Sequence, residues 1–374
     1  MNKKMLFKEI TIASVISLGI ITSFLIFNPF KQNTLIANQS NDPAVQKLAR
    51  DLDSLVTRYE DYHYNFGIRV TSTQNDETLY TKNEDQAFIP ASNLKLFPTA
   101  AALETLGNDF KWKSTFYADG PVQNGVLKGN LIFKSEGDPA ISEIYLNSKI
   151  SNLFREWANE LKKQGIMTIS GNFIVDNSAF SVSEIGKGWK SNYEQAYYAA
   201  LPSSFSINEN YIKVSVTGAN KKGRKPGVTI YPYNGGVHIV NNAITVKGRR
   251  SAISITRDDN NNTIYINGKI GKKRSSGRLI NLAKPGDYAS EMLYSSLKDN
   301  KIIIKGDLKI ATSPLSMEKW QALYRHESPE LSLLLKRVNK KSNNFMANQL
   351  YLTLGSVLKQ DSNQANQVLK EFLE

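Results

Sequence analysis

The segment from residue 88 to residue 106 constrains this chain most, because it places a possible nucleophile and a possible base at the start of an apolar helix. It reads FIPASNLKLFPTAAALETL, a Pro-Ala step followed by a run rich in Ala and Leu. Residues three apart on a helix lie on one face, with Cβ atoms about 5–6 Å apart. We therefore expect the Lys95 amine to reach the Ser92 hydroxyl, and we expect the helix after Lys95 to be buried.

A serine hydroxyl is a weak nucleophile until a neighbouring group accepts its proton. The ordinary lysine pKa of about 10.4 is too high for a base at neutral pH, but burial among Ala, Leu and Phe side chains favours the neutral amine. Backbone N–H groups at the helix start would also stabilise a developing oxyanion. Pro98 should kink the helix, unless the helical register begins at Ser92 itself.

The Ser-x-x-Lys spacing alone is a weak signal. It also occurs at Ser295, Ser316 and Ser356, and a motif match is only a hypothesis until its context supports it. Ser92 is the strongest candidate because only its match lies at a Pro-Ala-Ser entry to an apolar helix.

Composition excludes several other chemistries. The chain has no cysteine, so disulfides, thiol catalysis and cysteine-ligated metals are ruled out. Its three histidines, His63, His238 and His326, are too scattered to suggest a metal site or a histidine-dependent triad. Lysine remains as the base, and we expect neither a cofactor nor a metal ion.

The net charge is strongly positive, with 47 Lys and Arg against 34 Asp and Glu, a formal +13. Such an excess would fit nucleic acid, an acidic envelope polymer or anionic lipid. No nucleic-acid-binding module is visible, so we expect no nucleic-acid partner. Basic clusters at residues 221–225, 249–250 and 272–278 are interpreted as solvated turns, with contact to an envelope polymer as the alternative.

The N-terminus has the pattern of a targeting segment. Lys3, Lys4 and Lys8 precede a run without charge at residues 10–27. Its length fits either a membrane-spanning helix or a signal peptide, so residues 1–28 are predicted to be one or the other, with 10–27 in the membrane if uncleaved. The flanking lysines keep the start in the cytoplasm, so the rest of the chain is expected to be extracytoplasmic, after a polar linker at residues 29–42.

Periodicity predicts an α/β domain followed by a β-rich region. A helix should begin at Pro43, and strand-like runs at 66–72 and 78–83 flank a polar turn before the Ser92 segment. One amphipathic helix is expected at 144–163. The expected later strands are 129–133, 169–175, 211–216, 237–246 and a hairpin of 253–255 with 264–266.

A second motif lies 250 residues after the first. Ser342-Asn343-Asn344 opens an apolar, helix-like run that ends near Leu354. Ser-x-Asn is the second element of the penicillin-recognising serine enzymes. Ser and Asn are also preferred helix N-caps, and taken alone an ordinary cap would explain this segment.

With both motifs, the chain resembles the penicillin-binding protein 4 type of D-alanyl-D-alanine carboxypeptidase/endopeptidase, the class C low-molecular-mass group. Four further segments resemble that family in the same order: 129–139, 169–180, 188–200 and 328–332. The resemblance covers about residues 60–374. It implies an α/β (α+β) penicillin-recognising domain of the β-lactamase/transpeptidase type, built from residues 43–108 and 328–374, with the β-rich residues 109–327 inserted between them.

The resemblance also implies acyl transfer on peptidoglycan stem peptides. Ser92 would attack the D-Ala-D-Ala bond, and Lys95 would accept its proton. Ser342 would relay the proton to the leaving group, and Asn344 would hold the substrate's peptide amide. β-Lactams would inhibit by acylating the same serine. These roles require Ser92 and Ser342 to share one pocket with Lys95 between them.

The chain departs from the family in one respect. The third element, Lys-Thr/Ser-Gly, does not occur after Ser342. We therefore expect an incomplete, C-terminally shortened catalytic domain that is inactive or slowed, since losing one oxyanion donor can cost about 10²–10³ in rate. Two other functions stay open: a non-catalytic, membrane-anchored peptidoglycan-binding protein, and a serine β-lactamase, against which the long insertion speaks.

Overall fold

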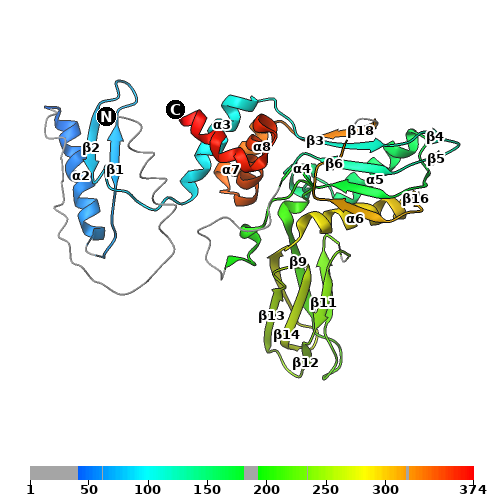
Figure 1. Cartoon of the computed structure of the whole chain (residues 1–374). Coiled ribbons are helices and arrows are strands. Elements are labelled where there is room, and N and C mark those ends of the chain that lie inside the picture. The colour runs from blue at the N-terminus through cyan, green and yellow to red at the C-terminus, as the bar shows by residue number, and fades with distance from the viewer. Residues whose placement is uncertain (1–40, 61, 181–192, 234, 317–319) are drawn as a thin grey trace. The chain divides into compact units, whose positions relative to one another are not determined.

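The computed structural model describes residues 41–60, 62–180, 193–233, 235–316 and 320–374 (Figure 1). They fall into two compact units, Met1–Ala91 and Ser92–Glu374. The predicted signal or anchor lies outside the described residues. None of the helices within the described ranges has the length and apolar content needed to span a bilayer. The predicted domain limits at residues 43–108, 109–327 and 328–374 stay predictions.

The first unit is a helix with a β-hairpin. Its elements are α2 (Pro43–Glu60), β1 (Ile68–Thr71) and β2 (Thr78–Lys82), with β1 and β2 antiparallel. Two polar contacts join the helix to β2. The buried Tyr80 donates its hydroxyl to Asp53 at 3.0 Å, and the Lys82 amine donates to Glu60 at 3.0 Å. The helix and the hairpin that the sequence predicted are confirmed.

The second unit contains a mixed five-stranded sheet in the order β17-β8-β6-β3-β18. The β17–β8 and β8–β6 pairs are parallel, whereas β6–β3 and β3–β18 are antiparallel. A small sheet of short strands, β16-β7-β5-β4, lies beside it in the fold. The bounds are β3 (Lys113–Ala118), β4 (Val122–Gln123), β5 (Val126–Leu127), β6 (Leu131–Ser135), β7 (Thr168–Ile169), β8 (Phe173–Asp176), β16 (Ile303–Ile304), β17 (Leu308–Ala311) and β18 (Gln321–Glu327).

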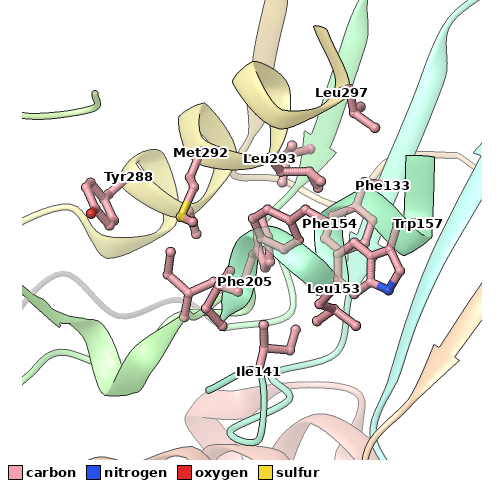
Figure 2. Close-up of a cluster of buried hydrophobic side chains, with 14 of the residues drawn as sticks. Phe133, Ile141, Leu153, Phe154, Trp157, Phe205, Tyr288, Met292, Leu293 and Leu297 are labelled. Carbon is pink, nitrogen blue, oxygen red and sulfur yellow. The ribbon is translucent and has the colours of Figure 1, made fainter. Parts of the chain in front are cut away.

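Two helices, α5 (Ile150–Lys163) and α6 (Pro285–Asp299), pack on this sheet. Figure 2 shows the aromatic centre of the core, where Trp157 of α5 packs against Phe133 and Phe154 and these two rings also contact Phe205. The Trp157 ring centroid is 5.3 Å from that of Phe133 and 5.1 Å from that of Phe154. The predicted helix at 144–163 is two helices, because Asn147 takes a left-handed conformation that ends α4 (Glu143–Leu146).

The β-rich region contains two further sheets. One has the order β10-β9-β15, and in the other β11, β12 and β13 all pair with β14. The predicted hairpin is confirmed, since β13 and β14 are antiparallel with Ile255 opposite Ile266. The predicted strand at 237–246 is two strands, separated where Asn241 Oδ1 accepts the Ala243 N–H at 3.1 Å. The bounds are β9 (Tyr211–Thr217), β10 (Gly227–Tyr231), β11 (His238–Asn241), β12 (Ile244–Val246), β13 (Ser251–Arg257), β14 (Thr263–Gly271) and β15 (Ser275–Asn281).

Helices from both ends of the second unit form another apolar cluster, which includes Ala101, Leu334, Leu350 and Val368. They are α3 (Leu96–Leu106), α7 (Leu331–Lys340), α8 (Asn344–Lys359) and α9 (Ala365–Leu373), and the 3-10 turn η1 (Ser92–Lys95) precedes α3. The expectation that the helix after Lys95 is buried was wrong for one face. Ala101 and Ala102 are buried in the cluster, but Leu96, Phe97 and Leu103 are exposed. The reason is that α7, α8 and α9 pack on the side of α3 that carries Ala101 and Ala102.

Asp138 follows shortly after β6, which ends at Ser135, and its side chain is fully buried. Its Oδ1 accepts the Ala140 N–H at 2.7 Å, but within the described ranges Oδ2 has no hydrogen-bond partner. A basic group, His326 Nε2, is 3.9 Å from Oδ2. Burial raises the pKa of Asp138 to about 7, and burial also lowers the pKa of His326. This carboxyl group therefore makes the fold sensitive to pH.

We expect Asp138→Asn to change how stability depends on pH. The carboxyl ionises near its ordinary pKa of 3.8 in the unfolded chain but near 7 in the folded chain. Its contribution to the free energy of unfolding is present below pH 3.8 and is lost as the pH rises to about 7, a loss of roughly 3–4 kcal/mol. The amide carries no charge, so the variant should gain stability relative to wild type over this range.

Urea unfolding from about pH 4 to about pH 8 measures this gain. The exposed Asp109 offers a matched control, since Asp109→Asn removes a carboxylate that is already solvated. A stability difference between Asp138→Asn and wild type that stayed constant with pH would contradict the prediction.

Candidate active site

Ser92 and Lys95 are the first and last residues of η1, the tight turn that leads into α3. A 3-10 helix has three residues per turn, so their side chains are eclipsed on one side. The Lys95 Nζ donates to Ser92 Oγ at 3.2 Å. Pro98 lies in the first turn of α3, where its missing N–H breaks no intrahelical hydrogen bond. Pro98 therefore costs α3 no hydrogen bond, because the 3-10 turn begins at Ser92 and α3 itself begins only at Leu96.

Ser342 reaches the same point from the turn between α7 and α8. Its hydroxyl donates to Ser92 Oγ at 2.7 Å, and Lys95 Nζ donates to Ser342 Oγ at 3.4 Å. Ser342 takes a left-handed conformation with φ of 52°, a strained position for a residue with a Cβ. Two serines that lie 250 residues apart thus form one triangle with a lysine amine, and both serines are exposed to solvent.

The helix cap of α8 is neither Ser342 nor Asn344. The middle residue of the motif, Asn343, is the N-cap, and its Oδ1 accepts the Met346 N–H at 2.8 Å. An ordinary cap therefore explains Asn343 but leaves the other two side chains unexplained. Asn344 Nδ2 donates to the Tyr198 carbonyl at 2.9 Å. Among the described residues no group donates to Asn344 Oδ1, which therefore can accept from a bound N–H.

The electrostatics of Lys95 favour a base. Lys95 is half-buried, and this burial lowers the pKa of its amine below the ordinary 10.5. No carboxylate within the described ranges forms an ion pair with it. An acidic neighbour would have favoured the charged form. The neutral amine, which alone can accept a proton from a serine hydroxyl, is thus more accessible than for a solvated lysine.

Glu209 is a site residue that the sequence analysis missed. Its buried carboxylate accepts from Arg337 Nε at 2.9 Å and from Arg337 Nη2 at 2.8 Å. Its second oxygen accepts from Asn343 Nδ2 at 2.8 Å. Since a carboxylate can only accept, it forces the Asn343 amide to turn Nδ2 toward Glu209 and Oδ1 toward the Met346 N–H. Glu209 therefore fixes the cap of α8 and the backbone that presents Ser342 and Asn344.

The sequence contains a signal for the turn that carries Glu209, but no signal for the loop that this turn contacts. Asn208, Glu209 and Asn210 all have left-handed φ values, 46°, 57° and 57°. Two asparagines, which tolerate this conformation best after glycine, flank the glutamate and indicate an unusual turn. Nothing in the sequence indicates that the turn meets a loop 134 residues later.

Comparisons with known proteins find similar chains. Residues 48–374 match the D-Ala-D-Ala carboxypeptidase 3 (S13) family. The chain is 28% identical over 298 residues to the D-alanyl-D-alanine carboxypeptidase of Actinomadura sp. (strain R39), covering 77% of this chain and 54% of that protein. It is 25% identical over 291 residues to the D-alanyl-D-alanine carboxypeptidase DacB of Haemophilus influenzae, covering 77% and 58%. The chain spans about half the length of the curated relatives it matches.

Solved structures share the fold. The crystal structure of penicillin binding protein 4 from H. influenzae matches with a TM-score of 0.70 at 24% identity, covering 83% of this chain and 67% of that one. A second crystal structure of the same protein, in complex with a β-lactam, matches with a TM-score of 0.65 at 22% identity, covering 83% and 65%. The predicted fold class is therefore confirmed.

Proposed function

Because the chain belongs to the D-Ala-D-Ala carboxypeptidase 3 (S13) family, we propose that it carries the acylation centre of a serine-type D-alanyl-D-alanine carboxypeptidase/endopeptidase. Its substrates are the stem peptides of peptidoglycan, and β-lactams acylate the same serine. The observation that carries the proposal is the contact of Lys95 Nζ, Ser92 Oγ and Ser342 Oγ within 2.7–3.4 Å of one another.

The geometry supports a specific order of proton transfers. The neutral Lys95 amine accepts the proton of Ser92 as Oγ attacks the carbonyl carbon of the D-Ala-D-Ala bond. The C–N bond then breaks, and the proton passes from Lys95 through the Ser342 hydroxyl to the amine of the departing D-alanine. Water hydrolyses the resulting ester and restores Ser92. Asn344 Oδ1 accepts a peptide N–H of the substrate and holds the acyl chain in place.

The same proposal includes the compartment of the reaction, which is outside the cytoplasm. Three lysines precede the uncharged residues 10–27, a pattern that directs the rest of a chain out of the cytoplasm. The substrate and the β-lactams are then met in the cell envelope, with the chain secreted or anchored by residues 10–27.

Release of D-alanine from a stem peptide that ends in D-Ala-D-Ala tests the proposal. We expect slowed release by the chain, and a further fall of about 10²–10⁴ in rate for Ser342→Ala, the range typical of a lost proton-transfer group. Hydrolysis of a β-lactam without D-alanine release would favour a β-lactamase. Retention on isolated peptidoglycan, with neither D-alanine release nor a β-lactam adduct, would favour a non-catalytic binding protein.

Glu209→Gln is expected to slow acylation by a β-lactam about 10²-fold, the cost that a displacement of about 1 Å can have in an active site. A glutamine must point an N–H at either Arg337 or Asn343, both of which are donors. The cap of α8 then loses its orientation, and Ser342 moves with it. The second-order rate of adduct formation measures the effect.

A double variant separates positioning from simple loss of stability. In Glu209→Gln combined with Asn343→Asp, the new amide donates to the new carboxylate, which also accepts the Met346 N–H, so the hydrogen bonds are restored with the same total charge. We expect recovery to within about tenfold of the wild-type rate. The exposed Glu104 provides the control variant Glu104→Gln, with an unchanged rate. No recovery in the double variant, at equal stability, would contradict the positioning role.

A further inference from the structure

The positive charge of this protein is concentrated in one part of the chain. Residues 211–281 contain fourteen Lys and Arg and only two acidic residues, Asp258 and Asp259, a net charge of +12. The whole chain has a net charge of +13. The remaining residues are therefore almost neutral in sum, and the basic character comes from the two sheets formed by β9 to β15.

The topology gathers most of these cations at one end of the two sheets. Three turns hold ten of them: 218–226 between β9 and β10, 247–250 between β12 and β13, and 272–274 between β14 and β15. In register, Thr217 lies opposite Gly227 and Ser275, while Gly271 lies opposite Val246. Each turn thus leaves its strands at the same end, where Figure 1 shows β12. We call these three turns the basic end.

Backbone hydrogen bonds join the three turns into one surface. The Lys273 N–H donates to the Gly218 carbonyl at 3.0 Å, which connects the third turn to the first. The Gly271 N–H donates to the Arg250 carbonyl at 2.8 Å, which connects the third turn to the second. The Thr245 N–H donates to the Arg224 carbonyl at 2.9 Å, which ties β12 to the first turn. The cations are therefore held close together by the backbone.

No charge within the described ranges neutralises this surface. All ten cationic side chains of the basic end are exposed, and none of them is in an ion pair there. Asp258 and Asp259 follow β13 at the opposite end, since β13 runs from Ser251, opposite Ile270, to Arg257, opposite Ile264. Like charges repel, so folding alone gives no reason to concentrate them. Binding of a polyanion to this surface would be favourable, because the counterions of the polyanion are released when the lysines and arginines replace them.

We propose that the basic end binds a linear, water-soluble polyanion with repeated phosphate groups, a phosphate-ester polymer of the cell envelope. The three turns contain no large apolar side chain, which argues against insertion into a membrane surface, where an apolar face anchors the protein. Lysine and arginine on turns offer many donors without a fixed groove, which suits a flexible chain of phosphates. Binding holds the active site of the proposed enzyme within the envelope.

A binding experiment with the full chain tests this surface. The probe is fluorescently labelled inorganic polyphosphate of about 100 phosphates, in about 50 mM salt. The test variant combines Lys221→Gln, Lys222→Gln, Lys272→Gln and Lys273→Gln. The control combines Lys113→Gln, Lys128→Gln, Lys149→Gln and Lys305→Gln. These four lysines are exposed and lie outside the basic end, and their substitution removes the same amount of positive charge as the test variant. Thermal unfolding of both confirms that they fold.

We expect wild type to bind, with an affinity that falls steeply as salt rises because counterions are released. The test variant should bind at least about tenfold more weakly with a smaller salt dependence, and the control should stay within about threefold of wild type. β-Lactam adduct formation should be unchanged in both, which keeps this result separate from the proposed function. Two outcomes with polyphosphate would overturn the proposal: no binding by wild type, or equal weakening in both variants. The proposal would also be overturned if the chain bound duplex DNA more tightly than polyphosphate, or bound vesicles of anionic lipid but not polyphosphate.

Discussion

Ser92→Ala is expected to lower the rate of β-lactam adduct formation by about 10³-fold or more, which amounts to loss of the adduct in a practical assay. The hydroxyl that is proposed to form the covalent bond is removed. Ser342 Oγ lies 2.7 Å from Ser92 Oγ, but its proposed role is to transfer a proton, so we do not expect it to replace the nucleophile. Intact-mass measurement after incubation with a penicillin records the adduct directly.

Ser356 provides the matched control for that experiment. It is the first residue of another Ser-x-x-Lys match, but it lies within α8, and its lysine, Lys359, pairs with Glu371 at 2.8 Å. Ser356→Ala should therefore form the adduct at the wild-type rate. An adduct that persisted in Ser92→Ala and disappeared in Ser356→Ala would contradict the assignment of Ser92, because the nucleophile would then be Ser356.

Lys95→Met should slow acylation by about 10²–10⁴-fold, the usual contribution of a general base. The methionine side chain has nearly the same length and no amine, so Ser92 keeps its surroundings but loses its proton acceptor. Lys341→Met, at an exposed lysine beside Ser342, is the control and should change the rate little.

The pH dependence of the same reaction identifies the base. Only the neutral amine accepts a proton, so the wild-type rate should rise with pH as Lys95 loses its proton. Burial lowers the pKa of Lys95, so the midpoint should lie below the ordinary 10.5. Lys95→Met should lose this rise. A wild-type profile that is flat with pH, or a rise that survives in Lys95→Met, would contradict the assignment of Lys95 as the base.

The part of the site that the sequence predicts depends on short spacings. Ser92 and Lys95 lie three residues apart at the start of a helix, and the geometry of any helical turn then brings their side chains together. Ser342 came from the resemblance to penicillin-recognising enzymes, and its 2.7 Å contact with Ser92 agrees with that expectation. The catalytic roles of these residues stay predictions until the variants are measured.

The sequence could not predict contacts that depend on long-range packing. The contact of Glu209 with the capping Asn343 requires a turn of the β-rich region to meet a loop 134 residues away. The exposed Leu96 and Phe97 were expected to be buried because their apolar character indicates burial, whereas exposure depends on which helices pack beside them. The sequence gives the number of charged residues. Only the register of the strands shows that three basic turns lie together at one end of the two sheets.

Peptide mapping of the β-lactam adduct tests the central claim most directly. Trypsin cleaves after Lys82 and Lys95, and the peptide of residues 83–95 contains Ser92 as its single hydroxyl side chain. Ser342 lies in a separate peptide, residues 342–359. The proposed acylation centre predicts that the added mass is found on the peptide of residues 83–95. Added mass on residues 342–359, or on neither peptide, would contradict it.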